Sequence, residues 1–214
     1  MFETLRAYGV IPVVAVESRD SGLRVCEALC EGGLPVAEIT FRTEAAEETI
    51  KAATEAFPDM HVGAGTILSV DNLHRAVDAG ATFGVSPGLN PAVVQAAVDR
   101  GFGFAPGVST ATDIEQALAF GLRELKFFPA EAVGGVTMLK ALNGPYGHLK
   151  LTFCPTGGIK PENMLDYLEL ASVPVVGGSW LTKKTVIDQK GFGGVTELAR
   201  EAVAAVRGLR GSEV

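Results

Sequence analysis

The chain has 214 residues, of which 47% are hydrophobic and 20% charged, and its formal net charge is −7. This length suits one large α/β domain, and the composition leaves little material for disordered segments. The acidic balance argues against nucleic acid or an anionic membrane surface as the partner. We therefore predict a single domain over residues 1–214 that acts on a small molecule.

The cysteines and histidines show no metal-ligand spacing. Cys26 and Cys30 are close together on an expected helix, Cys154 lies far from them, and the 3 histidines are scattered. Buried thiols in a reducing cytosol are the favoured interpretation. The longest apolar run, residues 10–16, is too short to cross a membrane, and the N-terminus does not resemble a signal peptide. We expect a cytoplasmic protein.

Short apolar runs alternate with segments of helical spacing along the chain. A short helix over residues 2–8 is expected first, lying across the bottom of the fold. The expected strands are residues 9–16, 36–40, 61–64, 81–86, 103–106, 124–128, 151–155 and 173–176. The expected helices are residues 20–31, 43–56, 70–79, 91–99, 112–120, 136–142, 161–170 and 194–207.

This alternation predicts a (β/α)8 barrel, the TIM-barrel fold. The short connections between strand and helix imply that the strands are parallel. A doubly wound open sheet is the structural alternative. An open sheet would not need polar residues at the ends of so many strands, whereas a barrel collects its chemistry there.

The expected strand over residues 124–128 carries the strongest functional signal. Leu125 and Phe127 alternate with Lys126, so Lys126 points to the opposite face, inside the predicted barrel. Burial there disfavours a charged ammonium, and Pro129 ends the strand because it has no N–H for the sheet. A buried lysine at a strand end is suited to act as a Schiff-base nucleophile.

The second expected strand offers a partner for this lysine. Val36, Glu38 and Thr40 share one face, and Arg42 follows on the loop at the same end of the barrel. Glu38 and Lys126 could instead form a structural buried ion pair. Arg42 could equally cap the surface of the second helix.

Glycine-containing turns follow several strands at this same end. They are Gly63-Ala64-Gly65-Thr66, Ser86-Pro87-Gly88, Pro155-Thr156-Gly157-Gly158 and Gly177-Gly178-Ser179. Glycine lets the backbone approach a ligand closely, and barrels commonly bind phosphate after their last two strands. Each turn by itself is common, and a single threonine in a turn more often stabilises the turn than binds a ligand. The two glycine pairs after the last two strands, Gly157-Gly158 and Gly177-Gly178, together favour a phosphate site.

These turns, with Glu38-Ile39-Thr40-Phe41-Arg42-Thr43-Glu44 and Leu125-Lys126-Phe127-Phe128-Pro129-Ala130-Glu131, resemble the 2-dehydro-3-deoxy-phosphogluconate (KDPG) aldolases. That family overlaps with the 4-hydroxy-2-oxoglutarate (KHG) aldolases. The resemblance spans about residues 9–181 in the family's order. It implies a class I aldolase on a barrel, usually a homotrimer, that needs no metal or other cofactor.

The resemblance also implies a role for each matching residue. Lys126 forms an iminium ion with the C2 ketone of a 2-keto acid, and Glu38 moves protons. The products are pyruvate and glyceraldehyde 3-phosphate. The implied substrate-binding residues are Arg42 at the carboxylate, Thr66, Thr156 and Phe128 at the pyruvyl end, Pro87 as a further contact, and Gly157, Gly158, Gly178 and Ser179 at the phosphate.

Three alternatives remain open. The same chemistry could act on another 2-keto acid, either unphosphorylated or the galactonate epimer, because the pyruvyl end is better defined than the aldehyde end. A phosphosugar isomerase or epimerase would use Glu38 as a base without a covalent step. An inert binding barrel is disfavoured by the intact set Lys126, Glu38 and Arg42.

Overall fold

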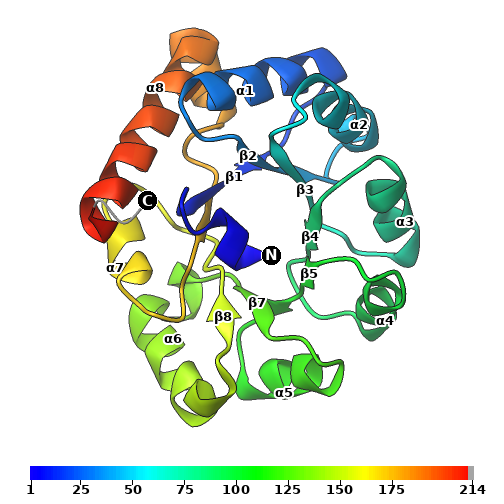
Figure 1. The fold of residues 1–214 in the computed structure, drawn as a ribbon, viewed down its shortest axis with the longest axis vertical. Coiled ribbons are helices and arrows are strands. Elements are labelled where there is room, and N and C mark those ends of the chain that lie inside the picture. Colours follow the sequence, from blue (N-terminus) through cyan, green and yellow to red (C-terminus); the bar gives the residue numbers. More distant parts are fainter. Residues whose placement is uncertain (212–214) are drawn as a thin grey trace.

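The computed structural model describes residues 1–211. They form a curled sheet of parallel strands surrounded by helices (Figure 1). The strands are β1 Val10–Val14, β2 Val36–Thr40, β3 His61–Gly65, β4 Phe83–Val85, β5 Phe104–Ala105, β6 Gly107–Val108, β7 Glu124–Phe127, β8 Thr152–Phe153 and β9 Val176–Gly178. The helices are α1 Arg19–Glu31, α2 Ala46–Ala56, α3 Val70–Asp78, α4 Pro91–Asp99, α5 Ala111–Ala119, α6 Gly135–Asn143, α7 Met164–Leu168 and α8 Lys184–Arg210.

The strand order closes into the predicted barrel. One sheet runs β5-β4-β3-β2-β1-β9 and the other runs β6-β7-β8, with every pairing parallel. A single bridge between Thr156 and Gly177 connects the β8 end to β9, and the Gly177 N–H donates to the Pro155 carbonyl at 2.8 Å. The TIM-barrel prediction is confirmed.

The fifth strand departs from the expectation. It is split into β5 and β6, with Pro106 between them. Proline has no N–H to donate to a ladder, so it interrupts the pairing that residues 103–106 were expected to make. The two pieces pair with different neighbours, β5 with β4 and β6 with β7. The fifth strand therefore links the two sheets covalently.

Side-chain caps begin several of the outer helices immediately after the strand-end loops. Ser18, Ser69 and Asn90 accept hydrogen bonds from backbone N–H groups at the starts of α1, α3 and α4. Thr110 and Asp113 form a reciprocal capping box at α5. These caps use N–H groups that the helix leaves unpaired, and they turn the chain from strand into helix.

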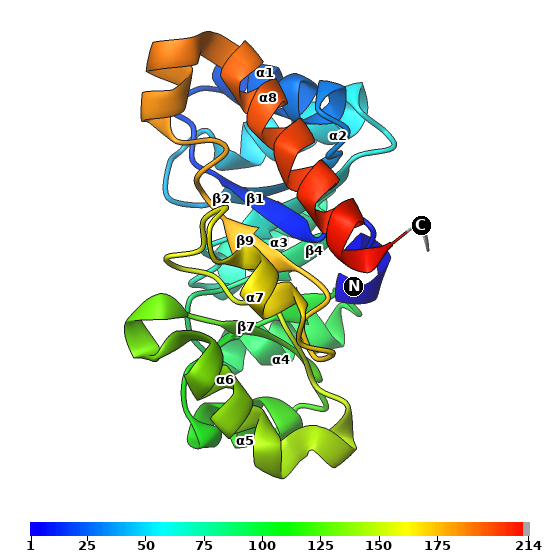
Figure 2. The same ribbon diagram turned by 90° about the vertical axis from the view of Figure 1, so that its left-hand side faces the viewer.

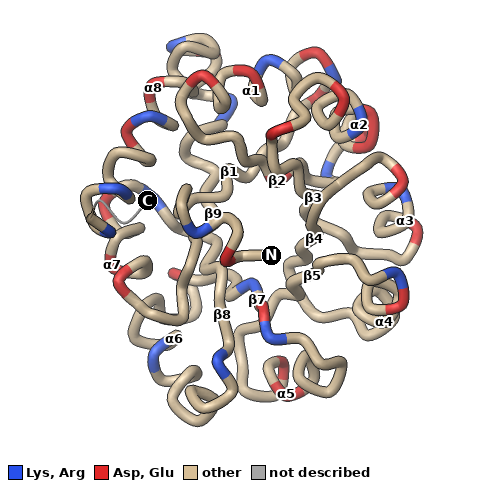
Figure 3. Tube along the Cα trace, in the orientation of Figure 1, with Lys and Arg blue, Asp and Glu red and all other residues tan. Residues whose placement is uncertain are grey.

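Charge separates the outside of the barrel from its strands. Lysine, arginine, aspartate and glutamate lie mostly on the outer helices, and the strands are largely uncharged apart from a few positions near β2 and β7 (Figure 3). Leu125 and Phe127 in β7 have no exposed surface, as expected for side chains packed under the helices. The few charged residues near β2 and β7 therefore differ from the rest of the barrel interior.

Both ends of the described chain lie on one side of the molecule (Figure 2). The expected N-terminal helix is present as a short 3-10 helix, Phe2–Leu5, whose Phe2 N–H donates to Glu124 Oε1 at 2.7 Å. Glu124 begins β7, so this helix lies at the N-terminal end of the barrel, as predicted. The single-domain prediction for residues 1–214 stays a prediction, and its last three residues lie outside the described part.

The last two helices differ most from the expected ranges. Helix α7 covers only Met164–Leu168, whereas α8 begins at Lys184, ten residues earlier than expected. A kink at Gly191 interrupts α8 with a φ of 64°, a conformation that glycine adopts without steric cost. None of the described helices combines the length and apolar character needed to cross a membrane.

Candidate active site

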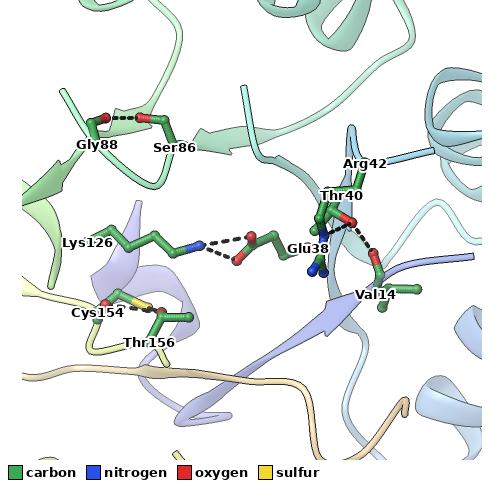
Figure 4. Close-up of polar contacts among 9 residues, drawn as sticks. All are labelled: Val14, Glu38, Thr40, Arg42, Ser86, Gly88, Lys126, Cys154 and Thr156. Carbon is green, nitrogen blue, oxygen red and sulfur yellow. Dashed lines mark hydrogen bonds and ion pairs between the residues drawn. The ribbon is translucent and has the colours of Figure 1, made fainter. Parts of the chain in front are cut away.

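The barrel interior holds a buried ion pair. Lys126 Nζ donates to both carboxylate oxygens of Glu38, at 2.9 and 3.2 Å. The two side chains are 6% and 3% exposed. They come from β7 and β2, which are not neighbours in the barrel, and they point at each other across its interior (Figure 4). The sequence predicted a buried Lys126 and left open an ion pair with Glu38, and the structure shows that pair.

The space for Glu38 depends on a glycine in the neighbouring strand. Thr40 and Gly65 are partners in the pairing of β2 with β3. A Cβ atom placed on Gly65 would lie 2.1 Å from Glu38 Oε1, closer than any real contact. Gly65 therefore leaves room for the carboxylate to reach Lys126. The sequence predicted that glycine here lets the backbone approach a ligand. In the structure, the Glu38 side chain occupies the space beside Gly65.

A cavity of about 140 Å³ lies at the C-terminal end of the strands, and its lining includes neither Lys126 nor Glu38. The Phe128 ring, which lines it, has its centroid 5.9 Å from Lys126 Nζ. Its lining residues are Val13, Arg42, Phe128, Thr156, Gly157, Gly158, Ile159, Gly177 and Ser179. Six predicted substrate-binding residues are thus brought together in one cavity, and Arg42 is the only charged side chain among its lining residues.

The loop after β8 lines this cavity with Thr156, Gly157, Gly158 and Ile159. Gly157 and Gly158 have φ angles of 98° and 82°, which residues other than glycine rarely adopt. The loop is held by two hydrogen bonds, from the Ala130 N–H to the Thr156 carbonyl at 2.8 Å and from the Glu131 N–H to the Gly157 carbonyl at 3.0 Å. Successive N–H groups in such turns form sites for anions.

Besides Lys126 and Glu38, three predicted substrate-binding residues lie outside the lining of this cavity. Thr66 follows β3 with a φ of 57°. Pro87 lies in the turn after β4, where the Ser86 hydroxyl donates to the Gly88 carbonyl at 2.6 Å. Gly178 makes room for Trp180, whose ring would lie 1.6 Å from a Cβ atom at that position. Their substrate contacts stay predictions.

The sequence interpretation omitted Val13, Ile159 and Gly177, which also line the cavity. Gly177 precedes Gly178 in the glycine pair expected at the phosphate, and the predicted role of Gly178 stays a prediction. Val13 and Ile159 carry no chemical signal that distinguishes them from core residues. Only their positions at strand ends could have indicated them.

A buried thiol, Cys154, lies next to Thr156, which lines the cavity. Burial raises the pKa of Cys154 to about 12, although the positive charge of Lys126 acts in the opposite direction. Its Sγ lies 3.8 Å from Thr156 Oγ1. The protonated thiol is not a competing nucleophile at neutral pH. In residues 1–211, no group of three or more His, Cys, Asp or Glu side chains is placed to bind a metal ion.

Comparison with known proteins identifies the family of this arrangement. Residues 1–198 match the family model described as "Aldolase: KDPG and KHG aldolase". A 2-dehydro-3-deoxy-phosphogluconate aldolase from Dickeya dadantii is 44% identical over 202 residues, which are 94% of each chain.

Two solved structures superimpose closely on the barrel. A KDPG aldolase from Legionella pneumophila, with pyruvate captured as a covalent carbinolamine intermediate, has a TM-score of 0.89 at 36% identity, covering 94% of this chain and 98% of its own. A 2-keto-3-deoxy-6-phosphogluconate aldolase of Zymomonas mobilis with 3-phosphoglycerate has a TM-score of 0.88 at 39% identity, covering 95% of each chain.

Proposed function

This chain belongs to the KDPG and KHG aldolase family, and we propose that it reversibly cleaves 2-dehydro-3-deoxy-6-phosphogluconate to pyruvate and glyceraldehyde 3-phosphate. The observation that supports this most directly is the contact of 2.9 Å between Lys126 Nζ and Glu38 Oε1 inside the barrel. An amine nucleophile and a group that exchanges protons with it are the two parts that Schiff-base catalysis requires.

Glu38 prepares Lys126 for attack. It accepts a proton from the ammonium, and the neutral amine adds to the C2 ketone of the substrate. Glu38 gives that proton to the hydroxyl of the resulting carbinolamine, which leaves as water, so an iminium ion forms and Glu38 is again a carboxylate. Glu38 then takes the proton of the C4 hydroxyl, the C3–C4 bond breaks, and its electrons flow into the iminium to give an enamine. Glyceraldehyde 3-phosphate leaves, Glu38 returns a proton to C3 of the enamine, and water releases pyruvate from Lys126.

The cavity provides a site for each end of the substrate. Arg42 holds the carboxylate, since its planar guanidinium donates two parallel hydrogen bonds. Phe128 and Thr156, both in the lining, contact the pyruvyl end, with Thr66 and Pro87 on the neighbouring loops. The N–H groups of Gly157, Gly158 and Gly178 and the Ser179 hydroxyl bind the distal phosphate.

A related substrate is the second candidate. The family description covers KHG aldolases as well, and cleavage of 4-hydroxy-2-oxoglutarate needs the same Lys126 and Glu38. That substrate is shorter and ends in a carboxylate at C5, whereas the first ends in a phosphate on C6. The cavity meets this distal end with backbone and hydroxyl groups, and those accept either anion. Comparing kcat/KM for the two substrates decides between them.

Trapping the covalent intermediate tests the proposal. Incubation with pyruvate and borohydride should add one reduced adduct per chain, on the peptide that contains Lys126, detected by mass spectrometry. Lys126→Ala should abolish both the adduct and cleavage. Lys140→Ala is the matched control, because Lys140 lies on the outer helix α6 and is exposed. An adduct on another lysine, or full activity in Lys126→Ala, would overturn the assignment.

We further propose a cytoplasmic homotrimer. The trimer rests on the resemblance to the family. Leu68, a large apolar side chain that is 56% exposed near the C-terminal end of β3, supports a contact between copies. A monomer in sedimentation at micromolar concentration would exclude the trimer without affecting the proposed chemistry.

A further inference from the structure

Thr40 connects the end of β1 to the side chain of Arg42. Its hydroxyl donates to the Val14 carbonyl at 2.9 Å, and the same oxygen accepts a hydrogen bond from Arg42 Nε at 3.1 Å (Figure 4). Thr40 is 1% exposed and lies on the same face of β2 as Glu38. A buried hydroxyl is thus interposed between a main-chain carbonyl and a guanidinium group.

The direction of these two bonds follows from their donors. A hydroxyl has one proton, and the Val14 carbonyl can only accept, so the Thr40 proton is committed to that carbonyl. The lone pairs of the oxygen are then left for a donor. Arg42 Nε carries a single N–H and can only donate, so it occupies this acceptor. The carbonyl therefore orients the hydroxyl to receive Arg42.

This contact determines which part of Arg42 remains for a ligand. With Nε engaged, the two terminal amino groups of the guanidinium are left as a planar fork for a ligand, and Arg42 is a lining residue of the cavity. Arg42 is otherwise an exposed residue, and a long side chain in solvent samples many rotamers. Holding Nε removes much of that freedom before a ligand arrives.

We propose that Thr40 is a positioning residue that orients the Arg42 guanidinium for the carboxylate of the 2-keto acid; this inference rests on the proposed function. Thr40 is not among the residues that line the cavity, and its hydroxyl contacts Val14 and Arg42. It acts by lowering the entropic cost of binding, so its removal weakens recognition of the carboxylate and leaves the covalent chemistry intact.

The test compares two ligands that differ in one charge. Borohydride-trapped adduct is measured against the concentration of pyruvate and of methyl pyruvate, whose ester lacks the carboxylate. In Thr40→Val, which keeps the shape but lacks the hydroxyl, half-saturation for pyruvate should rise about tenfold, the value of one hydrogen bond to a charged group. Half-saturation for methyl pyruvate should change less than about twofold, and Thr40→Ser should restore pyruvate binding.

Thr82→Val is the matched control. The Thr82 hydroxyl also donates to the carbonyl of a neighbouring strand, Val62 at 3.1 Å, but it accepts nothing from an arginine. This variant should bind both ligands like the wild type. If Thr40→Val does not fold, exchange of the Arg42 Nε proton in the wild type, assigned through Arg42→Lys, gives a second measurement, and slow exchange is expected.

The outcomes separate this inference from the function on which it rests. Unchanged pyruvate half-saturation in Thr40→Val, equal weakening of both ligands, or fast exchange of the Arg42 Nε proton would overturn the positioning role alone. The absence of an adduct in the wild-type protein would overturn the proposed function and this inference together.

Discussion

The hydroxyl of Tyr167 donates a hydrogen bond to a carboxylate oxygen of Glu131 and so joins α7 to the segment that follows β7. Tyr167 is fully buried. Burial and the hydrogen bond to Glu131 together raise the pKa of Tyr167, so the hydroxyl remains a donor throughout the physiological range. Glu131 also packs against Gly158, where an added Cβ would lie 2.6 Å from its side chain. This bond therefore supports the wall of the cavity from behind.

Removing that hydroxyl should destabilise the fold measurably. We expect Tyr167→Phe to lower the free energy of unfolding by about 1–2 kcal/mol, because a hydrogen bond to a charged group is lost. Tyr146→Phe is the control, since Tyr146 also donates to a glutamate, Glu115 at 3.2 Å, at an exposed site. It should cost less than about 0.5 kcal/mol. If urea unfolding shows equal losses of unfolding free energy in the two variants, the buried bond contributes no more than the exposed one.

Glu38→Gln should separate catalysis from folding. An amide cannot accept and return protons, so we expect kcat to fall by about 10²–10⁴. The amide is similar in size to the carboxylate, and its oxygen still accepts a hydrogen bond from Lys126. Steady-state kinetics give the loss, and circular dichroism checks that the fold persists. Retained kcat in a folded variant would mean that Glu38 and Lys126 form a purely structural pair.

Gly65→Ala should disturb the same pair without changing a charged group. The added methyl would lie 2.1 Å from Glu38 Oε1 and must displace the carboxylate. We expect a loss of kcat comparable with that of Glu38→Gln. Gly147→Ala is the matched control, because nothing lies within 4 Å of its Cβ position. Normal turnover in Gly65→Ala would contradict the argument that Gly65 makes room for Glu38.

The buried thiols should make stability fall at alkaline pH. Burial raises the pKa of Cys26 from 9.0 to about 12, and burial does the same for Cys154. Above pH 9 the unfolded chain loses thiol protons that the folded chain retains. The free energy of unfolding should therefore decrease as pH rises, by up to about 1.4 kcal/mol per pH unit for each thiol.

Urea unfolding between pH 8 and about 10.5 measures this slope. The double variant Cys26→Ala/Cys154→Ala should be less stable at every pH, because it loses packing, but its stability should decline less steeply. Cys30→Ala is the comparison: Cys30 is only partly buried and burial also raises its pKa, so this variant should reduce the slope less than the double variant does. An identical slope in the double variant and the wild type would show that the thiols do not cause the decline.

Alternation along single strands was sufficient to predict the central pair. The faces of β2 and β7 place Glu38 and Lys126 inside the barrel once the fold is known, and strand ends in a barrel meet at one edge. The contact between Arg42 and Thr40 was not predictable in the same way. It depends on the rotamer of a long side chain beyond the strand, where periodicity carries no information.

The boundaries that the sequence misplaced have identifiable causes. Pro106 splits a strand that its apolar neighbours make look continuous, and only the pairing partners reveal the break. Gly191 has a positive φ at the kink in α8, but glycine in a sequence is equally consistent with the end of a helix. In each case the local residues allow two conformations, and contacts elsewhere decide between them.

The junction between the β8 end and β9, which we call the seam, is held by a single bridge between Thr156 and Gly177. Both residues also line the cavity, so the seam and the cavity lie at the same place. An anion bound by Gly157 on one side and Ser179 on the other would span that seam. It would add hydrogen bonds at a junction that has only one β-bridge. Ligand binding should then slow hydrogen exchange first in residues 155–158 and 177–179, ahead of the paired strands β1 to β4. Ligand binding and the stability of the contact between residues 155–158 and 177–179 would then be thermodynamically coupled.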